Sequence, residues 1–345
     1  MMAFAAIKKP SAGYTLIELM LAMLLGIFLI TGLVQIFISS KQSYRMQESL
    51  SRLQESGRFA LDFIERDLRM AGFRGCASKS KTMPVNALVN KTAYIYNFST
   101  VIQGYNNVGA NWADPDGTGI TKPLVGGNDV LTIRRAGDDG VQITGVANAT
   151  APLKLARNTV PVLNVCDVVV AADCETATIF QITSNDPNSI THTQGGCSTT
   201  PTGGNAVAKL DKKYAEGSLY KFFTTTYFIK LNANQQPSLY RRVNANADEE
   251  LIEGVEQMQV QYGLDTDADT GRNANTYVNA NTILTAADWA KVVSVRVSLL
   301  VRTIEDNIAS ETLNYRYNGN NNNVGTDRRI RRVFTTTIAL RNKLF

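Results

Sequence analysis

One carboxylate, Glu18, interrupts the longest apolar run of the chain, which extends from Tyr14 to Ile38. As a helix this run is roughly 37 Å long, enough to cross a bilayer with some tilt. An ionised side chain within a membrane span costs about 3 kcal/mol on insertion scales. Glu18 is therefore expected to have a function, and its chemistry is that of a negative charge that needs a partner.

Two lysines, Lys8 and Lys9, precede the apolar run. Basic residues beside a span favour the cytoplasmic side, so the rest of the chain is expected on the far side of the membrane. Taken alone, this pattern also fits an ordinary signal anchor in which Glu18 complements the positive N-terminal end of the helix dipole.

The residues around Glu18 carry a family resemblance. Gly13 followed by YTLIEL closely resembles the type III signal of type IV prepilins and type II secretion pseudopilins. The resemblance implies that a prepilin peptidase cuts after Gly13 on the cytoplasmic face and methylates the new amino terminus at Tyr14. Glu18 then becomes the fifth mature residue. The usual first mature residue is Phe, so Tyr14 departs from the pattern but keeps its aromatic character.

Cleavage at this point leaves the apolar helix attached, unlike a secretory signal, which is removed together with its apolar core. The mature α-amine of Tyr14 is then a partner for Glu18 of a neighbouring subunit. Each charge offsets the desolvation of the other, and the pair sets the register between subunits.

Four cysteines follow the apolar run: Cys76, Cys166, Cys174 and Cys197. An exported head meets an oxidising compartment, so two disulfides are expected, and three connectivities are open. The favoured pairing is Cys76–Cys166 with Cys174–Cys197, because the second pair closes a local loop and the first ties the helix end to the sheet. A zinc site is not expected, since no C-x-x-C occurs and His192 is the only histidine.

Other candidate chemistry is sparse. His192 lies in a Thr/Gly/Ser loop without a nucleophile elbow, and we interpret it as a solvated residue. We therefore expect no enzymatic activity. Asp265, Asp267 and Asp269 alternate as calcium ligands do, but Gly271 comes one place late for an EF-hand and no glutamate closes the loop. Calcium is the one cofactor considered, and a solvated acidic turn is the alternative.

Charge does not favour nucleic acid as a partner. Removal of Lys8 and Lys9 with the leader takes the net charge from +5 to +3, because residues 1–13 contain no acid. The basic run Arg328–Arg332 would split its side chains between the two faces of a strand. An edge strand protected by charge accounts for that run, so no nucleic-acid partner is expected.

The elements that position these residues begin with a long helix, predicted from Tyr14 to about Ala71. After Lys41 the sequence becomes polar, yet apolar residues recur at three- and four-residue steps. The apolar face comprises Leu50, Leu53, Phe59 or Ala60, Phe63, Ile64 and Leu68. Gly72 and Gly75 supply the stop. Gly26, Gly32 and Gly57 are predicted soft points in the helix.

Beyond Cys76 the sequence predicts strands joined by Asn- and Gly-rich loops. The predicted strands are Asp129–Arg135, Asp167–Ala172, Ala177–Thr183, Leu219–Lys230, Ser238–Val243, Glu256–Gly263, Lys291–Thr303 and Arg328–Leu340. The fold class is therefore α+β: a pilin-like lollipop with a long N-terminal α-helix packed on a large antiparallel β-sheet head. The expected parts are a cleaved leader (1–13), a transmembrane and polymerisation half of the helix (14–38), an amphipathic half (39–75) and a periplasmic head (76–345). A subdomain break is expected near 205–213, with both parts sharing one sheet system.

Further segments narrow the resemblance. QESGRFALDFIERDLRMAGFRGC, MQVQYGLDTDADTGRN, WAKVVSVRVSLLVRT and VFTTTIALRN look like PilW-type minor pilins. The resemblance implies an inner-membrane, single-pass protein that later enters the extracellular type IV pilus and supports pilus assembly, twitching motility and cell adhesion. The implied partners are other minor pilins, the major pilin, the prepilin peptidase, the pilus assembly platform and a tip adhesin. Two other classes stay open: a type II secretion pseudopilin and a membrane-anchored surface-binding module that keeps its leader.

Overall fold

The computed structural model describes residues 13–343 except 81, 118, 157–161, 187, 198–202, 268–271, 318–319 and 325. Two compact units make up the chain, Met1–Ser51 and Arg52–Phe345, and they are described separately below. The boundary between them falls within a single long helix, α1.

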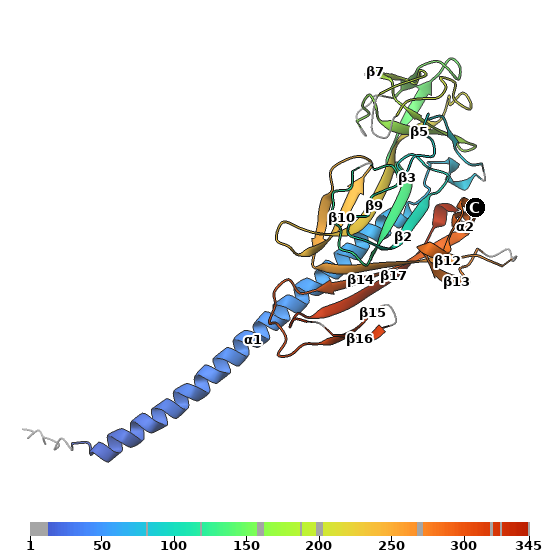
Figure 1. Cartoon of the computed structure of the whole chain (residues 1–345). Helices are drawn as coiled ribbons and strands as arrows, with labels where there is room; N and C mark the ends of the chain where they lie inside the picture. Colours follow the sequence, from blue (N-terminus) through green and yellow to red (C-terminus); the bar gives the residue numbers. More distant parts are fainter. Residues whose placement is uncertain are drawn as a thin grey trace, which may run out of the picture. The chain divides into compact units, whose positions relative to one another are not determined.

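Helix α1 (Leu16–Arg69) is one uninterrupted element of 54 residues (Figure 1). It agrees with the predicted helix to within two residues at each end. Gly72 ends the segment because its φ of +74° lies in the left-handed region that favours glycine. The backbone N–H of Gly72 then donates to the carbonyl oxygen of Arg134 at 2.9 Å, which turns the chain into the sheet.

Within Arg52–Phe345, one stripe of α1 is buried in the central hydrophobic core. Its apolar members are Leu53, Ala60, Ile64 and Leu68. Of the two alternatives Phe59 and Ala60, Ala60 is the buried one and Phe59 is 42% exposed, while Phe63, also expected on this face, is 38% exposed. The predicted amphipathic packing is thus confirmed for four positions, while two aromatic rings stay at the surface.

An eleven-stranded sheet forms most of this unit, in the order β1-β6-β5-β9-β3-β4-β8-β7, with β10 and β11 beside β9 and β2 beside β3. Its strands are β1 (Val85–Asn86), β2 (Ile102–Val108), β3 (Asn128–Gly145), β4 (Leu153–Leu155), β5 (Val168–Ala172), β6 (Ala177–Gln181), β7 (Ser184–Asp186), β8 (Ser189–Thr191), β9 (Ser218–Leu231), β10 (Pro237–Val243) and β11 (Glu249–Glu253). All its pairs are antiparallel except β1–β6. The fold class is therefore α+β with a large, mostly antiparallel sheet.

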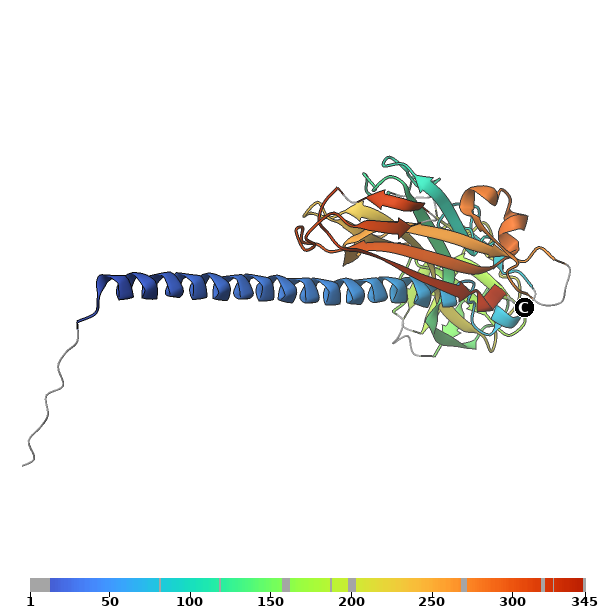
Figure 2. The ribbon, with the colours of Figure 1, turned by 90° about the horizontal axis from the view of Figure 1, so that it is seen from below.

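A second sheet of four strands has the order β13-β12-β14-β17. Figure 2 shows its long strands side by side. The strands are β12 (Val255–Leu264), β13 (Thr276–Asn279), β14 (Val292–Arg302) and β17 (Arg331–Ala339), and a separate hairpin consists of β15 (Asn314–Tyr317) and β16 (Asn320–Val324). Short helices complete the unit: η1 (Ala77–Lys79), η2 (Ala280–Thr282), α2 (Ala286–Ala290) and η3 (Arg341–Lys343). All eight strands predicted from the sequence are present.

Two strands, β3 and β9, run through the whole first sheet as an antiparallel pair (Figure 1). The first half of β3 and the last half of β9 pack in the core that contains α1. The last half of β3 and the first half of β9 carry a lobe built from residues 141–219, which has a hydrophobic core of its own. Asn205 and Leu210, within the expected subdomain break, are buried. The position of a domain boundary in the head stays a prediction.

Both disulfides expected from the sequence form, but the favoured pairing was wrong. Cys76 joins Cys174, and Cys166 joins Cys197. The reason is the hairpin of β5 and β6, which places Cys174 at its turn and Cys166 at its open end. Cys76, just after α1, meets the turn. Cys197 meets the open end, where its N–H donates to Gln181 Oε1 at 3.2 Å and Gln181 Nε2 donates to the Cys166 carbonyl oxygen at 3.1 Å.

Candidate assembly site

The predicted cleavage point lies immediately before α1. Gly13 and Tyr14 are both exposed, and the Tyr14 side chain is 86% accessible. Thr15 is the residue before the helix, and its Oγ1 accepts a hydrogen bond from the backbone N–H of Glu18 at 3.3 Å. In return, Glu18 Oε2 accepts from the backbone N–H of Thr15 at 3.5 Å. This reciprocal pair is a capping box, which satisfies two otherwise orphaned amides of the first turn.

The capping box was not predicted, although the T-x-x-E spacing from Thr15 to Glu18 is visible in the sequence. Glu18 therefore stabilises the first turn of its own helix without any partner from another subunit. A carboxylate has about four lone-pair sites, so accepting one backbone N–H leaves capacity for an ammonium group. The cap and the predicted ion pair are therefore compatible.

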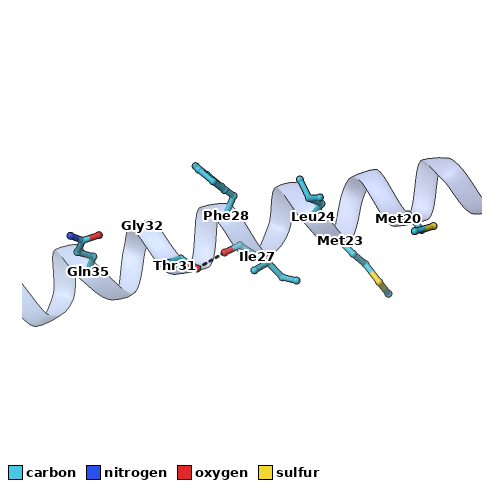
Figure 3. A pocket seen from close by; sticks show the side chains of 8 residues that line it. All are labelled: Met20, Met23, Leu24, Ile27, Phe28, Thr31, Gly32 and Gln35. Atoms are coloured by element: carbon cyan, nitrogen blue, oxygen red, sulfur yellow. Dashed lines mark hydrogen bonds between the residues drawn. The ribbon is translucent and has the colours of Figure 1, made fainter.

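The first half of α1 carries a mostly apolar pocket, whose lining side chains Figure 3 shows. Residues at three- and four-residue steps line it: Met20, Met23, Leu24, Ile27, Phe28, Thr31, Gly32 and Gln35. Thr31 Oγ1 donates to the Ile27 carbonyl oxygen at 2.8 Å, so its hydroxyl is satisfied within the helix. A Cβ added at Gly32 would meet nothing within 4 Å. By length and composition, α1 could cross a membrane.

A buried polar cluster holds the second half of α1 to the first sheet. Asp67 is 5% exposed and accepts at Oδ2 from the Tyr227 hydroxyl, at 2.7 Å. Arg135 Nη2 contacts the other carboxylate oxygen at 3.2 Å. Burial and the neighbouring Asp67 charge raise the pKa of Tyr227 well above its usual value, so this hydroxyl stays a neutral donor. Charge and hydrogen bonds thus fix the rotation of α1 against β3 and β9.

The second sheet contacts α1 at Gly57. A Cβ built on Gly57 would collide with the Phe334 ring of β17, so only a glycine lets this ring rest on the helix backbone. Gly57, expected to be a soft point, is instead a close-packing position. At the end of the helix, Asn342 Nδ2 donates to the carbonyl oxygens of Arg69 and Ala71, each at 3.3 Å. These bonds satisfy carbonyl groups that a helix end leaves open.

His192 is not the solvated loop residue expected from its neighbours. It is 3% exposed in the lobe, and its ring packs edge-on against Phe180 with centroids 5.3 Å apart. Nδ1 lies 2.9 Å from the Ala208 carbonyl oxygen and Nε2 lies 3.1 Å from that of Ala151. The imidazole therefore links three segments of the lobe, which is a structural role.

The candidate calcium loop lies only partly within the described residues. Asp265 and Asp267 are described, whereas Asp269 is not. Asn275 braces the loop: its Oδ1 accepts from Thr266 N at 2.9 Å, and its amide nitrogen donates to Asp267 Oδ2. Among the residues that the structure describes, no group of three or more His, Cys, Asp or Glu side chains could hold a metal ion. Calcium binding stays a prediction.

The basic run precedes and begins β17, which is an edge strand of the second sheet as expected. Asp327 contacts Arg329 Nη1 at 2.9 Å and Arg331 Nη1 at 2.7 Å. Arg331 Nε also contacts Glu256 at 2.7 Å. Carboxylates of the head thus offset part of the positive charge, which is consistent with a structural edge.

Comparison with known proteins identifies one related family. The family model described as PilW, type IV pilus-assembly protein W, matches residues 226–342. The match runs from within β9 to η3 and includes all of the second sheet. No curated protein and no solved structure matches the chain. Three of the four segments on which the PilW resemblance was based lie inside the matched residues, and we conclude that this chain is a PilW-like type IV pilus protein.

Proposed function

We propose that this protein is a minor pilin, a low-abundance subunit that is cut after Gly13, methylated at Tyr14 and incorporated into a type IV pilus. The observation that carries the proposal is the exposed apolar surface of the first half of α1, which follows a capped Glu18, in a chain whose residues 226–342 match the PilW family model. An apolar helix face needs an apolar surrounding, and lipid and a bundle of like helices both supply it.

The proposed mechanism is a transfer of the helix between these two surroundings. Before assembly, α1 lies in the inner membrane with its head in the periplasm. In the pilus, it lies among the helices of other minor pilins and the major pilin. The lollipop arrangement expected from the sequence is part of this proposal. The two disulfides support an oxidising location for the head.

In this mechanism, Glu18 sets the register between neighbouring subunits. The α-amine that cleavage creates at Tyr14 would be the charged partner, supplied by the next subunit. Such a pair is costly to break in an apolar surrounding, because the remaining charge is left without compensation. The role in assembly is to help start polymerisation with other minor pilins and to help present a tip adhesin, which would support twitching motility and adhesion. No catalytic step is involved.

Mass spectrometry of sheared pili tests this proposal. We expect an amino-terminal peptide that begins at N-methylated Tyr14, at low abundance beside the major pilin. A Gly13→Val variant is the control, since a branched side chain before the cut should block the peptidase and keep the leader on. Tyr14 processed in membranes but absent from pili would instead favour a type II secretion pseudopilin. An intact leader in the wild type would favour a membrane-anchored surface-binding module.

A further inference from the structure

A groove of about 490 Å³ lies on the head, between β2 with its following loop and the η2–α2 segment. Tyr105 and Trp112 line one side, and Ile283, Leu284 and Trp289 line the other. Its volume falls within the range of about 300–1,000 Å³ found for small-molecule sites. All of these residues belong to the unit Arg52–Phe345.

Aromatic rings dominate the walls. The chain has two tryptophans, Trp112 and Trp289, and both line this groove. The Trp112 ring lies 5.0 Å from the ring of Tyr105 in a tilted arrangement. Trp289 is held edge-on by Tyr262 at 4.8 Å. Leu284, at the rim, is 83% exposed. Trp289 is 9% exposed and Ile283 6%, so the apolar surface that this side offers to solvent comes mainly from Leu284.

A chain of hydrogen bonds prepares one hydroxyl as a donor into this groove. The buried guanidinium of Arg134 donates through Nη2 to Gln103 Oε1 at 3.0 Å. Gln103 Nε2 then donates to the Tyr105 hydroxyl oxygen at 2.8 Å. Because Tyr105 already accepts, its own hydrogen is left for an acceptor in the groove. Burial raises the pKa of Tyr105, so the hydroxyl stays protonated.

Two polar atoms at the groove also lack partners among the described residues. Asn106 Oδ1 is buried without a hydrogen bond, and Asn106 lines the groove. The hydroxyl of Tyr262, a fully buried residue, has none either and lies against Gly104, which lines the groove. Buried polar atoms are normally satisfied, so these two are exceptions in the packing beneath the groove, and the groove offers its polar contacts through Tyr105 and the exposed Asn281 instead.

The lining residues include no charged side chain in the part of the chain that the structure describes. Phosphates, carboxylates and other ionic ligands would find no counter-charge among these lining residues. Flat aromatic surface beside amide and hydroxyl groups instead suits a ligand with one apolar face and a polar rim. A sugar ring has this character, since its axial C–H bonds form an apolar face and its hydroxyls surround it.

We propose that this groove binds neutral sugar rings of a glycan, with a ring stacked on Trp112 and a ring hydroxyl accepting from Tyr105. Asn281 supplies a further amide contact at the edge of the sugar. This inference goes beyond pilus assembly and does not depend on it, because it uses contacts of the head alone.

Calorimetric titration of the purified full-length protein tests the proposal. The protein is kept in a non-glycosidic detergent, since alkyl glucosides would compete. The probes are glucose, galactose, N-acetylglucosamine and their β1,4-linked dimers. We expect saturable binding of at least one sugar in the millimolar range or tighter. Tryptophan emission should change in parallel, because both tryptophans line the groove.

Four variants make the outcome decisive. Trp112→Ala should weaken binding about tenfold or more, and Trp112→Phe should recover much of the loss. Tyr105→Phe, which keeps the ring and removes the hydroxyl, should weaken it about fivefold. Leu313→Ala, a substitution at a leucine that does not line the groove, should change nothing. Circular dichroism checks the fold of each variant. Binding of none of the sugars, or equal binding by wild type and Trp112→Ala, overturns the proposal.

Discussion

At the residue scale, Glu18 combines two tasks that mutation can separate. Glutamine at this position can still accept the Thr15 N–H but carries no charge, whereas Thr15→Ala removes its hydroxyl from the capping box and leaves the charge. If the charge sets the register, Glu18→Gln should be cleaved normally yet enter pili about tenfold less or worse. Thr15→Ala should cost about 1 kcal/mol of helix stability and leave incorporation nearly unchanged.

Immunoblots of sheared pili and of membrane fractions measure what share of each variant enters pili. Glu18→Ala, which removes both the charge and the capping carboxylate, is measured beside them. Normal incorporation of Glu18→Gln beside failure of Thr15→Ala would show that Glu18 acts through its cap alone.

Asp327 makes the head sensitive to acid. Hydrogen bonds from Arg331 and Arg329 hold the pKa of the Asp327 carboxyl well below its usual range. A lowered folded-state pKa contributes stability above about pH 4, the unfolded value, and that stability is lost as the pH falls through the folded-state pKa. Thermal unfolding of the full-length protein should therefore show a falling Tm below about pH 4. Asp327→Asn should lower Tm at neutral pH and flatten this acid limb.

Asp138→Asn is a suitable comparison, because its side chain is 60% exposed and lies 3.8 Å from Arg66. It should leave the acid limb unchanged. An acid limb of wild-type steepness in Asp327→Asn would contradict the role of this carboxylate.

At the scale of elements, the contact of α1 with β17 depends on the missing side chain of Gly57. Alanine is about 1 kcal/mol better than glycine in a helix interior. Here its Cβ would collide with the Phe334 ring. Overpacking of this kind costs about 1–3 kcal/mol, so Gly57→Ala should lower the free energy of unfolding despite its better helix propensity. Urea unfolding followed by circular dichroism measures the change.

Gly32→Ala is the matched control, since nothing lies within 4 Å of its added Cβ. Adding Phe334→Leu to Gly57→Ala should recover part of the loss. If Gly57→Ala is neutral on its own, the helix and β17 are not in the close contact described.

The two sheets are joined by side chains that complete the edge of β12. Strand β13 pairs only with Gln261–Leu264 of β12. Further along, Asn128 Oδ1 accepts from Met258 N and Asp129 Oδ2 accepts from Val260 N, both at 2.7 Å. Asp129→Ala would leave the Val260 amide unsatisfied, at a cost of about 1–3 kcal/mol. Hydrogen exchange should then speed up at Val260, and unchanged protection there would rule out this link.

Elements with strong periodicity were predictable from the sequence, whereas the way these elements pack together was less predictable. Long alternating strands such as β14 and the helix α1 follow from local pattern. Strands of two to four residues, such as β1 and β13, contain too little alternation to detect. His192 is buried by Ala151 and Ala208, which no local pattern links to it.

One part of the disulfide pairing, by contrast, was within reach of the sequence, namely the exclusion of a Cys166–Cys174 bond. Both strands of the β5–β6 hairpin were predicted, and Cys166 and Cys174 stand at opposite ends of the first. A hairpin of that length keeps its open end and its turn apart, so each cysteine needs a different partner. The capping box was equally visible. What local pattern could not supply was the choice between Cys76 and Cys197 for each end, because that depends on tertiary packing.

At the scale of the whole head, the two disulfides should differ in strength. Cys76–Cys174 spans 98 residues and Cys166–Cys197 spans 31. In the chain-entropy description the longer loop contributes about 1 kcal/mol more, within a typical total of about 2–5 kcal/mol. Replacing Cys76 and Cys174 with serine should therefore lower stability more than replacing Cys166 and Cys197. Denaturant unfolding of the two double variants measures the order, and the reverse order would refute the loop argument.

The pairing of β3 with β9 has a consequence for how such a protein can change over generations. Gln142 of β3 and Ser218 of β9 are register partners, so the chain leaves for the lobe and returns from it at neighbouring points. Because its two ends are adjacent, this segment can lengthen, shorten or be exchanged between lineages while the core that contains α1 stays the same. The lobe is thus a segment whose length and surface can vary while the pairing of β3 with β9 beside α1 is kept.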